Sequence, residues 1–140
     1  MVQIFFLCRH FIDMSEKQSL QKRFALFLLL CIPARLAITA AAKYIPLKYL
    51  QILGVIFLII GLSFLYLNFF DKRKTGLETG GNIIWWNDLR PVHGFLAIIF
   101  AILAINKIRD AWIVLLIDTI FGLVAFLAFH GLNNNFRKLF

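Results

Sequence analysis

Residues 49–70 constrain the fold more than any other stretch of the chain. Only three polar side chains, Gln51, Ser63 and Asn68, interrupt these 22 residues. A run of about 20 apolar residues forms a helix long enough to cross a hydrocarbon core about 30 Å thick. The segment is therefore predicted to span a membrane.

The composition of the whole chain also indicates that the protein lies in lipid. Hydrophobic residues make up 61% of the 140 positions, against about 45–50% in soluble globular domains. The net charge is +8, but the basic residues flank the apolar runs and do not line one polar element. Anionic lipid head groups are the expected counter-charge, and no specific nucleic-acid binding is expected. The two cysteines, Cys8 and Cys31, indicate no disulfide or metal framework.

Three further apolar runs approach the spanning length. We therefore predict an all-α fold, an integral membrane bundle of four transmembrane helices within residues 15–140. Residues 1–14 are predicted to form a separate N-terminal segment lying in the membrane interface. The four predicted spans are residues 20–42, 49–70, 89–108 and 111–130.

Residues with known positional preferences mark the helix ends. Pro33 lies inside the first span and predicts a kink there. Asp88 is the expected N-cap of the third helix, with Pro91 in its first turn, where a missing N–H has little effect. Asp110 is the expected N-cap of the fourth helix, and Gly131 its C-terminal stop.

The connections and the basic residues predict the topology. The short "NKIRD" connection makes the third and fourth helices an antiparallel hairpin, and an even number of spans places both termini on one side. Ten basic residues fall on that side and four on the other, so both termini and the 71–92 loop are predicted to be cytoplasmic. The ten are Arg9, Lys17, Lys22, Arg23, Lys72, Arg73, Lys74, Arg90, Arg137 and Lys138, and the four are Lys43, Lys48, Lys107 and Arg109.

Two fully ionisable residues, Arg35 and Asp118, lie deep within predicted spans. Arg35 is eight residues before Lys43, and Asp118 is eight residues after Asp110. Each charge is therefore about 12 Å from the non-cytoplasmic end of its helix. Because an isolated charge in a membrane is costly, we predict an intramembrane ion pair that packs the first helix against the fourth.

This pair has two possible roles. Intramembrane ionisable residues often mark an ion or proton pathway, whereas a static pair fixes helix register. The static pair is favoured because a relay needs further titratable groups through the membrane. The spans offer only hydroxyl and amide groups for that purpose, those of Thr39, Ser63, Asn68 and Thr119.

The stretch "IIWWNDLRPVHG" is the most distinctive motif in the chain. Tryptophan concentrates at membrane–water interfaces, so the motif is interpreted as an interfacial anchor that turns the chain into the third helix. Arg90 and His93 would then share a face at head-group depth, and binding of a phosphate or lipid head group is the alternative reading. The motif residues are Trp85, Trp86, Asp88, Arg90, Pro91 and His93.

The sequence gives little evidence for haem binding or for enzymatic catalysis. A haem between His93 and His130 is disfavoured, because His130 lies about 10 Å further from the hairpin turn along the helix axis. The sequence has no Gly-rich phosphate loop, no H-x-x-x-H and no serine elbow. We therefore expect no enzyme activity, no catalytic residue, no cofactor and no metal.

The sequence resembles a family of small uncharacterised multi-span membrane proteins encoded by large DNA viruses of protists and algae. The resemblance covers residues 20–130, and its most specific part is the series Gly80, Gly81, Trp85, Trp86, Arg90, Pro91, His93 and Gly94. It implies a viral or protist source and a location in a virion inner membrane or a host internal membrane. It implies nothing about chemistry.

Two functions from different classes follow as expectations. The first is a non-enzymatic structural or scaffolding component of a viral or internal membrane. Its basic cytoplasmic face would bind anionic membrane lipids, viral or membrane protein partners, or further copies of the chain. The alternative is a small oligomeric ion or proton channel or transporter that uses Arg35 and Asp118.

Overall fold

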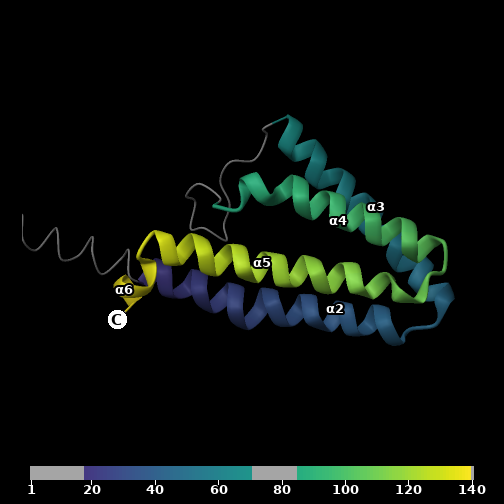
Figure 1. Cartoon of the computed structure of the whole chain (residues 1–140), viewed down its shortest axis with the longest axis horizontal. Helices are drawn as coiled ribbons and strands as arrows, with labels where there is room; N and C mark the ends of the chain where they lie inside the picture. Colours follow the sequence, from purple (N-terminus) through teal and green to yellow (C-terminus); the bar gives the residue numbers. More distant parts are fainter. Residues whose placement is uncertain (1–17, 71–84, 140) are drawn as a thin grey trace, which may run out of the picture.

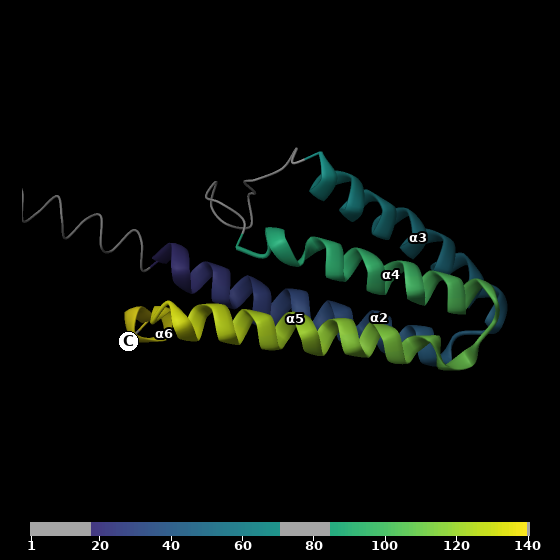
Figure 2. The same cartoon turned by 45° about the horizontal axis from the view of Figure 1, so that its top comes forward.

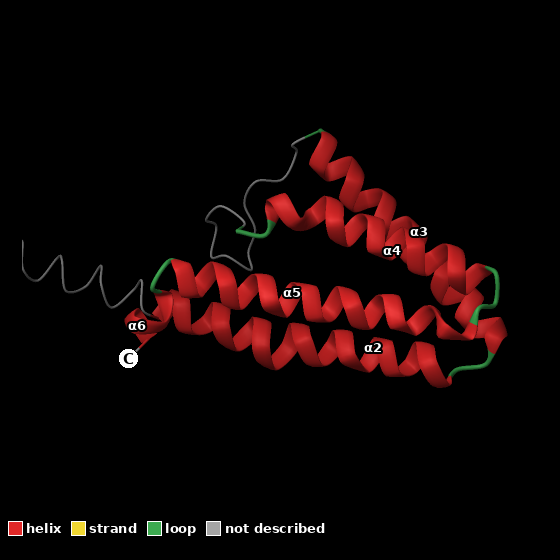
Figure 3. Cartoon of the chain, in the orientation of Figure 1, coloured by secondary structure: helices red, strands yellow, loops and turns green. Residues whose placement is uncertain are grey.

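The described part of the chain forms four long helices (Figure 1). The structure is a computed structural model that describes residues 18–70 and 85–139. All four helices are long and apolar enough to cross a membrane, and every regular element within the two described segments is helical (Figure 3). The predicted all-α, four-span architecture is confirmed at this level. The predicted interfacial segment, residues 1–14, lies outside the described residues.

The first helix, Gln18–Tyr44, changes its geometry before Pro33. It contains a π-helical segment, η1 (Leu26–Cys31), followed by α2 (Ile32–Tyr44). The N–H of Ile32 donates to the carbonyl of Phe27, five residues back. Proline has no N–H and crowds the carbonyl four residues before it, so the wider π turn accommodates the ring. The irregularity predicted at Pro33 takes this form.

The α3 helix (Leu47–Phe69) and the α4 helix (Arg90–Ile105) form a closely packed pair. Their backbones approach at glycines: a Cβ added to Gly61 would lie 2.8 Å from the carbonyl oxygen of Gly94. Small side chains on facing helices allow this approach in membranes, where contact area drives association. The buried small residues of α4 at this interface are Gly94, Ala97, Ala101 and Ala104.

The α5 helix (Trp112–Leu132) runs beside the first helix in the antiparallel direction (Figures 1 and 2). It follows the 3₁₀ turn η4 (Arg109–Ala111) and precedes the short helix α6 (Asn135–Leu139). Arg109 Nη1 donates to the carbonyl of Ile45 at 2.6 Å. This bond ties the start of α5 to the end of the first helix.

Two predicted caps are corrected. The N-cap residues of α4 and α5 are Leu89 and Ala111, and neither helix start has a side-chain cap bond. A 3₁₀ turn precedes each helix, so Asp88 and Asp110 lie inside the turns η3 (Asn87–Leu89) and η4. Pro91 occupies the first turn of α4 as predicted. The predicted stop, Gly131, lies one residue before the end of α5.

The helices are arranged as two pairs that meet at one end and diverge towards the other (Figures 1 and 2). One pair is the first helix with α5, and the other is α3 with α4. At the narrow end a cluster of buried apolar side chains joins the pairs. We call it the apolar plug: Ala42, Leu50, Phe100, Ala104, Ala111 and Leu115.

The outer surfaces of the four helices are apolar. Leu29 is 76% exposed, Ile59 62%, Ile99 47% and Val124 58%. A soluble chain rarely exposes such continuous apolar area, whereas lipid accommodates it. The protein is therefore described as a multi-pass membrane protein. The start of the first helix, coloured purple, and α6 lie at the same, wide end of the bundle (Figure 1).

Candidate functional site

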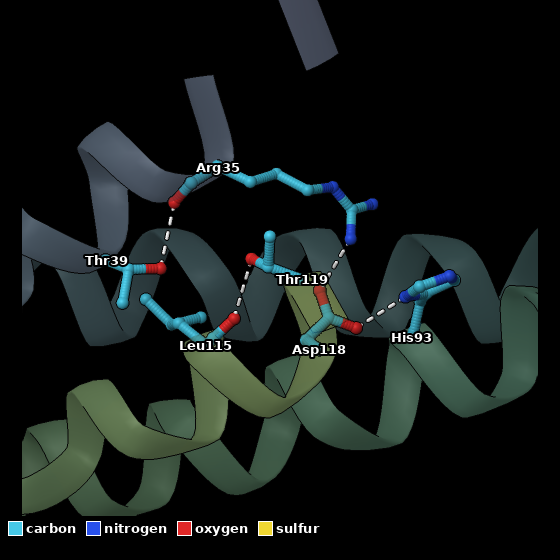
Figure 4. A network of polar contacts seen from close by, with 6 residues as sticks. All are labelled: Arg35, Thr39, His93, Leu115, Asp118 and Thr119. Atoms are coloured by element: carbon cyan, nitrogen blue, oxygen red, sulfur yellow. Dashed lines mark hydrogen bonds and ion pairs between the residues drawn. The ribbon is translucent and has the colours of Figure 1, made fainter. Parts of the chain in front are cut away.

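An ion pair joins the first and last spans. Arg35 Nη1 donates to Asp118 Oδ2 at 2.8 Å (Figure 4). The side chain of Asp118 is 17% exposed and that of Arg35 is 30% exposed. The two opposite charges are therefore in contact, as the sequence predicts.

A third ionisable residue shares the same carboxylate. His93 Nδ1 makes a hydrogen-bond contact with Asp118 Oδ1, the oxygen that Arg35 does not use (Figure 4). Because a carboxylate only accepts hydrogen bonds, Nδ1 carries the proton. Arg35, His93 and Asp118, here called the polar triad, come from three different helices. The triad therefore links the first-helix–α5 pair to α4 of the other pair.

The position of His93 corrects a prediction. The sequence predicts that His93 and Arg90 share a face open to head groups, but the side chain of His93 is buried and contacts Asp118. Arg90 is also buried, with 1% exposure, and its guanidinium carbon lies 4.9 Å from the centre of the Trp86 ring. The two side chains therefore do not form an exposed head-group site.

Small and hydroxyl residues surround the triad. Gly122 lies directly against two triad members: a Cβ at this position would be in ordinary van der Waals contact with Arg35 Nη1 and with His93 Cε1, each at 3.5 Å. Thr39 Oγ1 donates to the carbonyl of Arg35 at 2.8 Å. Thr119 donates to a carbonyl of its own helix in the same way. Both hydroxyl donors are thus used by backbone, and they do not extend the triad.

A cavity of about 470 Å³ lies beside the triad, between the diverging helix pairs. Arg35, His93 and Gly122 form one end, and Arg23 and Trp85 lie towards the wide end of the bundle. Its ionisable lining groups are Arg23, Arg35, His93 and the thiol of Cys31, and no described lining residue is acidic. The remaining lining residues are Leu26, Phe27, Leu30, Ala34, Phe64, Trp86, Leu89 and Phe126.

The tryptophan pair of the motif packs at the wide end. Trp85 stacks on Phe129, with ring centres 5.2 Å apart, and meets Phe126 edge to face at 5.6 Å. Trp86 faces Phe64 of α3 at 6.5 Å. The two rings therefore touch different helix pairs and hold the wide end together. Among Trp85, Trp86, Asp88, Arg90, Pro91 and His93, Asp88 is the exposed residue.

His130 belongs to a separate network. It is 1% exposed, accepts a hydrogen bond at 2.8 Å from Asn135 Nδ2, and lies 4.6 Å from the ring of Phe24 and 4.4 Å from that of Phe126. His93 and His130 therefore have different partners. Among the described residues, no group of three His, Cys, Asp or Glu side chains is placed to hold a metal ion.

Together, these features define a multi-pass helical membrane protein with a partly buried polar triad at the end of a largely apolar cavity. No protein-family model matches the chain, and comparisons with curated proteins and with solved structures gave no match. The chemistry of the site is therefore the guide to function.

Proposed function

We propose that this chain is a non-enzymatic structural or scaffolding component of a viral or internal membrane. The polar triad is the observation that supports this role. A single charge at the centre of a spanning helix costs roughly 2.5–3.5 kcal/mol, so Arg35 and Asp118 stabilise the one helix arrangement in which they meet. His93 extends that constraint to α4.

The apolar plug favours a structural role over a continuous pore. All six of its side chains are at most 5% exposed. They lie between the triad and the narrow end of the bundle, where the helix connections place Lys43 and Lys107. The buried hydroxyls next to the triad, those of Thr39 and Thr119, bond to backbone carbonyls, and the six plug residues beyond them are all apolar. Ion passage through one chain would require the plug to open.

Basic residues at the wide end supply the proposed contact surface. Lys22, Arg137 and Lys138 lie near the ends of the described chain that share this end. Each basic group near an anionic membrane surface contributes about 1 kcal/mol of attraction. Lipid head groups are the first expected partner, and an acidic protein or a further copy of the chain is the second.

Vesicle flotation tests the surface. The purified protein in nanodiscs should associate with vesicles containing phosphatidylserine and not with phosphatidylcholine vesicles, and the association should weaken with salt. Arg137→Gln with Lys138→Gln should reduce it, whereas Lys107→Gln at the opposite end should not. Equal association of both variants with both vesicle types would contradict the proposal.

One observation favours a second function, an oligomeric ion or proton channel or transporter. His93 adds a titratable group in direct contact with Asp118, which a proton pathway requires. Reconstituted protein separates the two functions. The scaffold role predicts no ion or proton flux in any gradient and a folded Arg35→Gln/Asp118→Asn protein that still associates with membranes. The transport role predicts flux that this double change abolishes.

A further inference from the structure

We propose that the cavity beside the polar triad binds a long-chain fatty acid. The carboxylate would lie against Arg35 and His93, and the acyl chain would follow the apolar lining towards Trp85. This ligand site does not depend on the scaffolding role. It rests on three observations: the charge of the lining, its apolar length and its opening to lipid.

The charge at the triad end is suited to an anion. Arg35 uses Nη1 for Asp118, and its side chain, 30% exposed, borders the cavity. His93 uses Nδ1, so Nε2 is its remaining ring nitrogen. Figure 4 shows the other guanidinium nitrogens and the far edge of the imidazole directed away from Asp118. A guanidinium edge binds a carboxylate through parallel hydrogen bonds.

The lining between the two ends is apolar and elongated. Arg23 and Arg35, both lining residues, are twelve positions apart on the first helix, which corresponds to roughly 18 Å. Phe27, Phe126 and Trp85 border the space between them. The volume of about 470 Å³ falls within the usual range of small-molecule sites, roughly 300–1,000 Å³. The shape suits one extended chain.

The cavity is open to the lipid side. Leu26 and Leu30 line it, and they are 50% and 64% exposed on a helix whose outer face is apolar. A fatty acid reaches such an opening from the bilayer as the neutral acid. On binding at the triad its proton passes to His93 Nε2, so that the resulting carboxylate faces two donors, the guanidinium of Arg35 and the imidazolium of His93. A phospholipid head group, in contrast, stays at the interface, far from the predicted depth of Arg35. The single-chain acid is therefore the occupant that reaches the triad.

The head group should dominate selectivity. Moving an acyl chain from lipid into an apolar cavity changes its free energy little, because lipid tails are as apolar as the lining. A carboxylate at this depth, however, lacks hydrogen-bond donors unless Arg35 and His93 provide them. The acid should therefore bind at least about tenfold more tightly than the alcohol of the same chain length.

Tryptophan fluorescence provides a direct test. Trp85 and Trp86 line the cavity, whereas Trp112, the third tryptophan of the chain, lies at the other end of the bundle, with Lys43 Nζ 4.6 Å from its ring centre. A stearic acid brominated in its chain should quench Trp112→Phe protein saturably in phosphatidylcholine nanodiscs. It should not do so in the Trp85→Phe/Trp86→Phe protein. Brominated stearyl alcohol supplies the head-group comparison.

Two variants separate head recognition from chain binding. Arg35→Gln/Asp118→Asn leaves no unpaired charge and should weaken binding of the acid at least about tenfold, with the alcohol unchanged. Ala34→Phe fills the cavity, keeps the triad, and should weaken binding of both. Lys107→Gln, at the helix connection, is the matched charge control and should bind like the original protein.

Three results would overturn the proposal. They are equal affinity for acid and alcohol, unchanged affinity for the acid in Arg35→Gln/Asp118→Asn, and unchanged quenching in Ala34→Phe. Size-exclusion profiles and helix content establish that each variant is folded. If the double variant does not fold, the Ala34→Phe result and the acid–alcohol ratio of the original protein decide the question.

Discussion

Asp118 is the residue on which the polar triad depends. One carboxylate oxygen meets Arg35 and the other meets His93. Because the surroundings are apolar, neither neighbour has an equivalent replacement acceptor in this arrangement. A substitution at Asp118 should therefore weaken the packing of three helices at once.

Replacing Asp118 with alanine should lower the free energy of unfolding by about 2.5–3.5 kcal/mol, because Arg35 keeps its charge within the membrane. Arg35→Gln/Asp118→Asn should lower it by only about 1 kcal/mol, since two neutral groups remain. Equilibrium unfolding in mixed micelles measures both. Asp110→Ala, an exposed aspartate, is the control and should leave stability unchanged. Equal losses in the single and double variants would contradict an ion pair.

Replacing His93 with leucine should have a smaller effect than losing Asp118. The histidine contact is one hydrogen bond within a membrane bundle, worth about 0.5–2 kcal/mol, and Arg35 still balances the carboxylate. A double-mutant cycle of His93→Leu with Asp118→Ala measures the coupling, because each single change removes the contact. Strictly additive losses would show that the contact contributes nothing to stability.

At the scale of the element, the π-helical segment aligns two basic residues. Twelve residues of regular α-helix, at 3.6 per turn, would leave Arg23 and Arg35 about a third of a turn apart. The η1 segment has more residues per turn, and both residues border one cavity. The proline that follows η1 thus influences which side chains of the first helix face the site.

The close packing of α3 against α4 allows a further prediction. A Cβ on Gly61 would lie 2.8 Å from the backbone oxygen of Gly94. This contact is too short, and a backbone atom cannot move aside as a flexible side chain can. Gly61→Val should therefore force the helices apart and lower stability by about 1–3 kcal/mol. Leu62→Val, at a neighbouring lipid-facing position that is 53% exposed, should change stability by less than about 0.5 kcal/mol. Similar effects of the two changes would contradict the close packing.

At the scale of the molecule, the two helix pairs form a wedge. The apolar plug closes the narrow end, and the triad links the pairs beyond it. Aromatic rings at the wide end, including Trp85 and Phe126, fill part of the opening. The cavity is the space that these contacts leave.

The predicted topology is tested with single cysteines. In a Cys8→Ser/Cys31→Ser background, Asn134→Cys and Lys107→Cys lie at opposite ends of the bundle. A membrane-impermeant thiol reagent should modify Asn134→Cys from the cytoplasmic side and Lys107→Cys from the other, following the distribution of basic residues. Modification of both from one side would contradict the four-span arrangement.

Much of the fold could be predicted from local pattern. The predicted spans differ by only a few residues from the observed helices, because long apolar runs in lipid must satisfy their backbone groups as helices. The pairing of Arg35 with Asp118 followed from depth alone. The π segment before Pro33 and the short helix α6 were not predicted, since neither has a strong periodic signal.

The role of His93 was missed for a geometric reason. It lies twelve residues before the end of α4, whereas Asp118 lies six residues after the start of α5. Counting residues outward from the connection between α4 and α5 therefore places His93 and Asp118 at different heights along the hairpin. The connection between the helices takes up part of this offset, because the 3₁₀ turn η4 rises about 2 Å per residue.

The sequence by itself determined the four long apolar helices of the described segments and the pairing of Arg35 with Asp118, because apolar length and helical rise are properties of single segments. The tertiary structure decided which helices pack in pairs, how far the pairs diverge, and that His93 reaches Asp118 beside a cavity. These features depend on close contacts between segments distant in sequence, such as Gly61 with Gly94 and Trp85 with Phe126. No periodicity within one segment encodes such contacts.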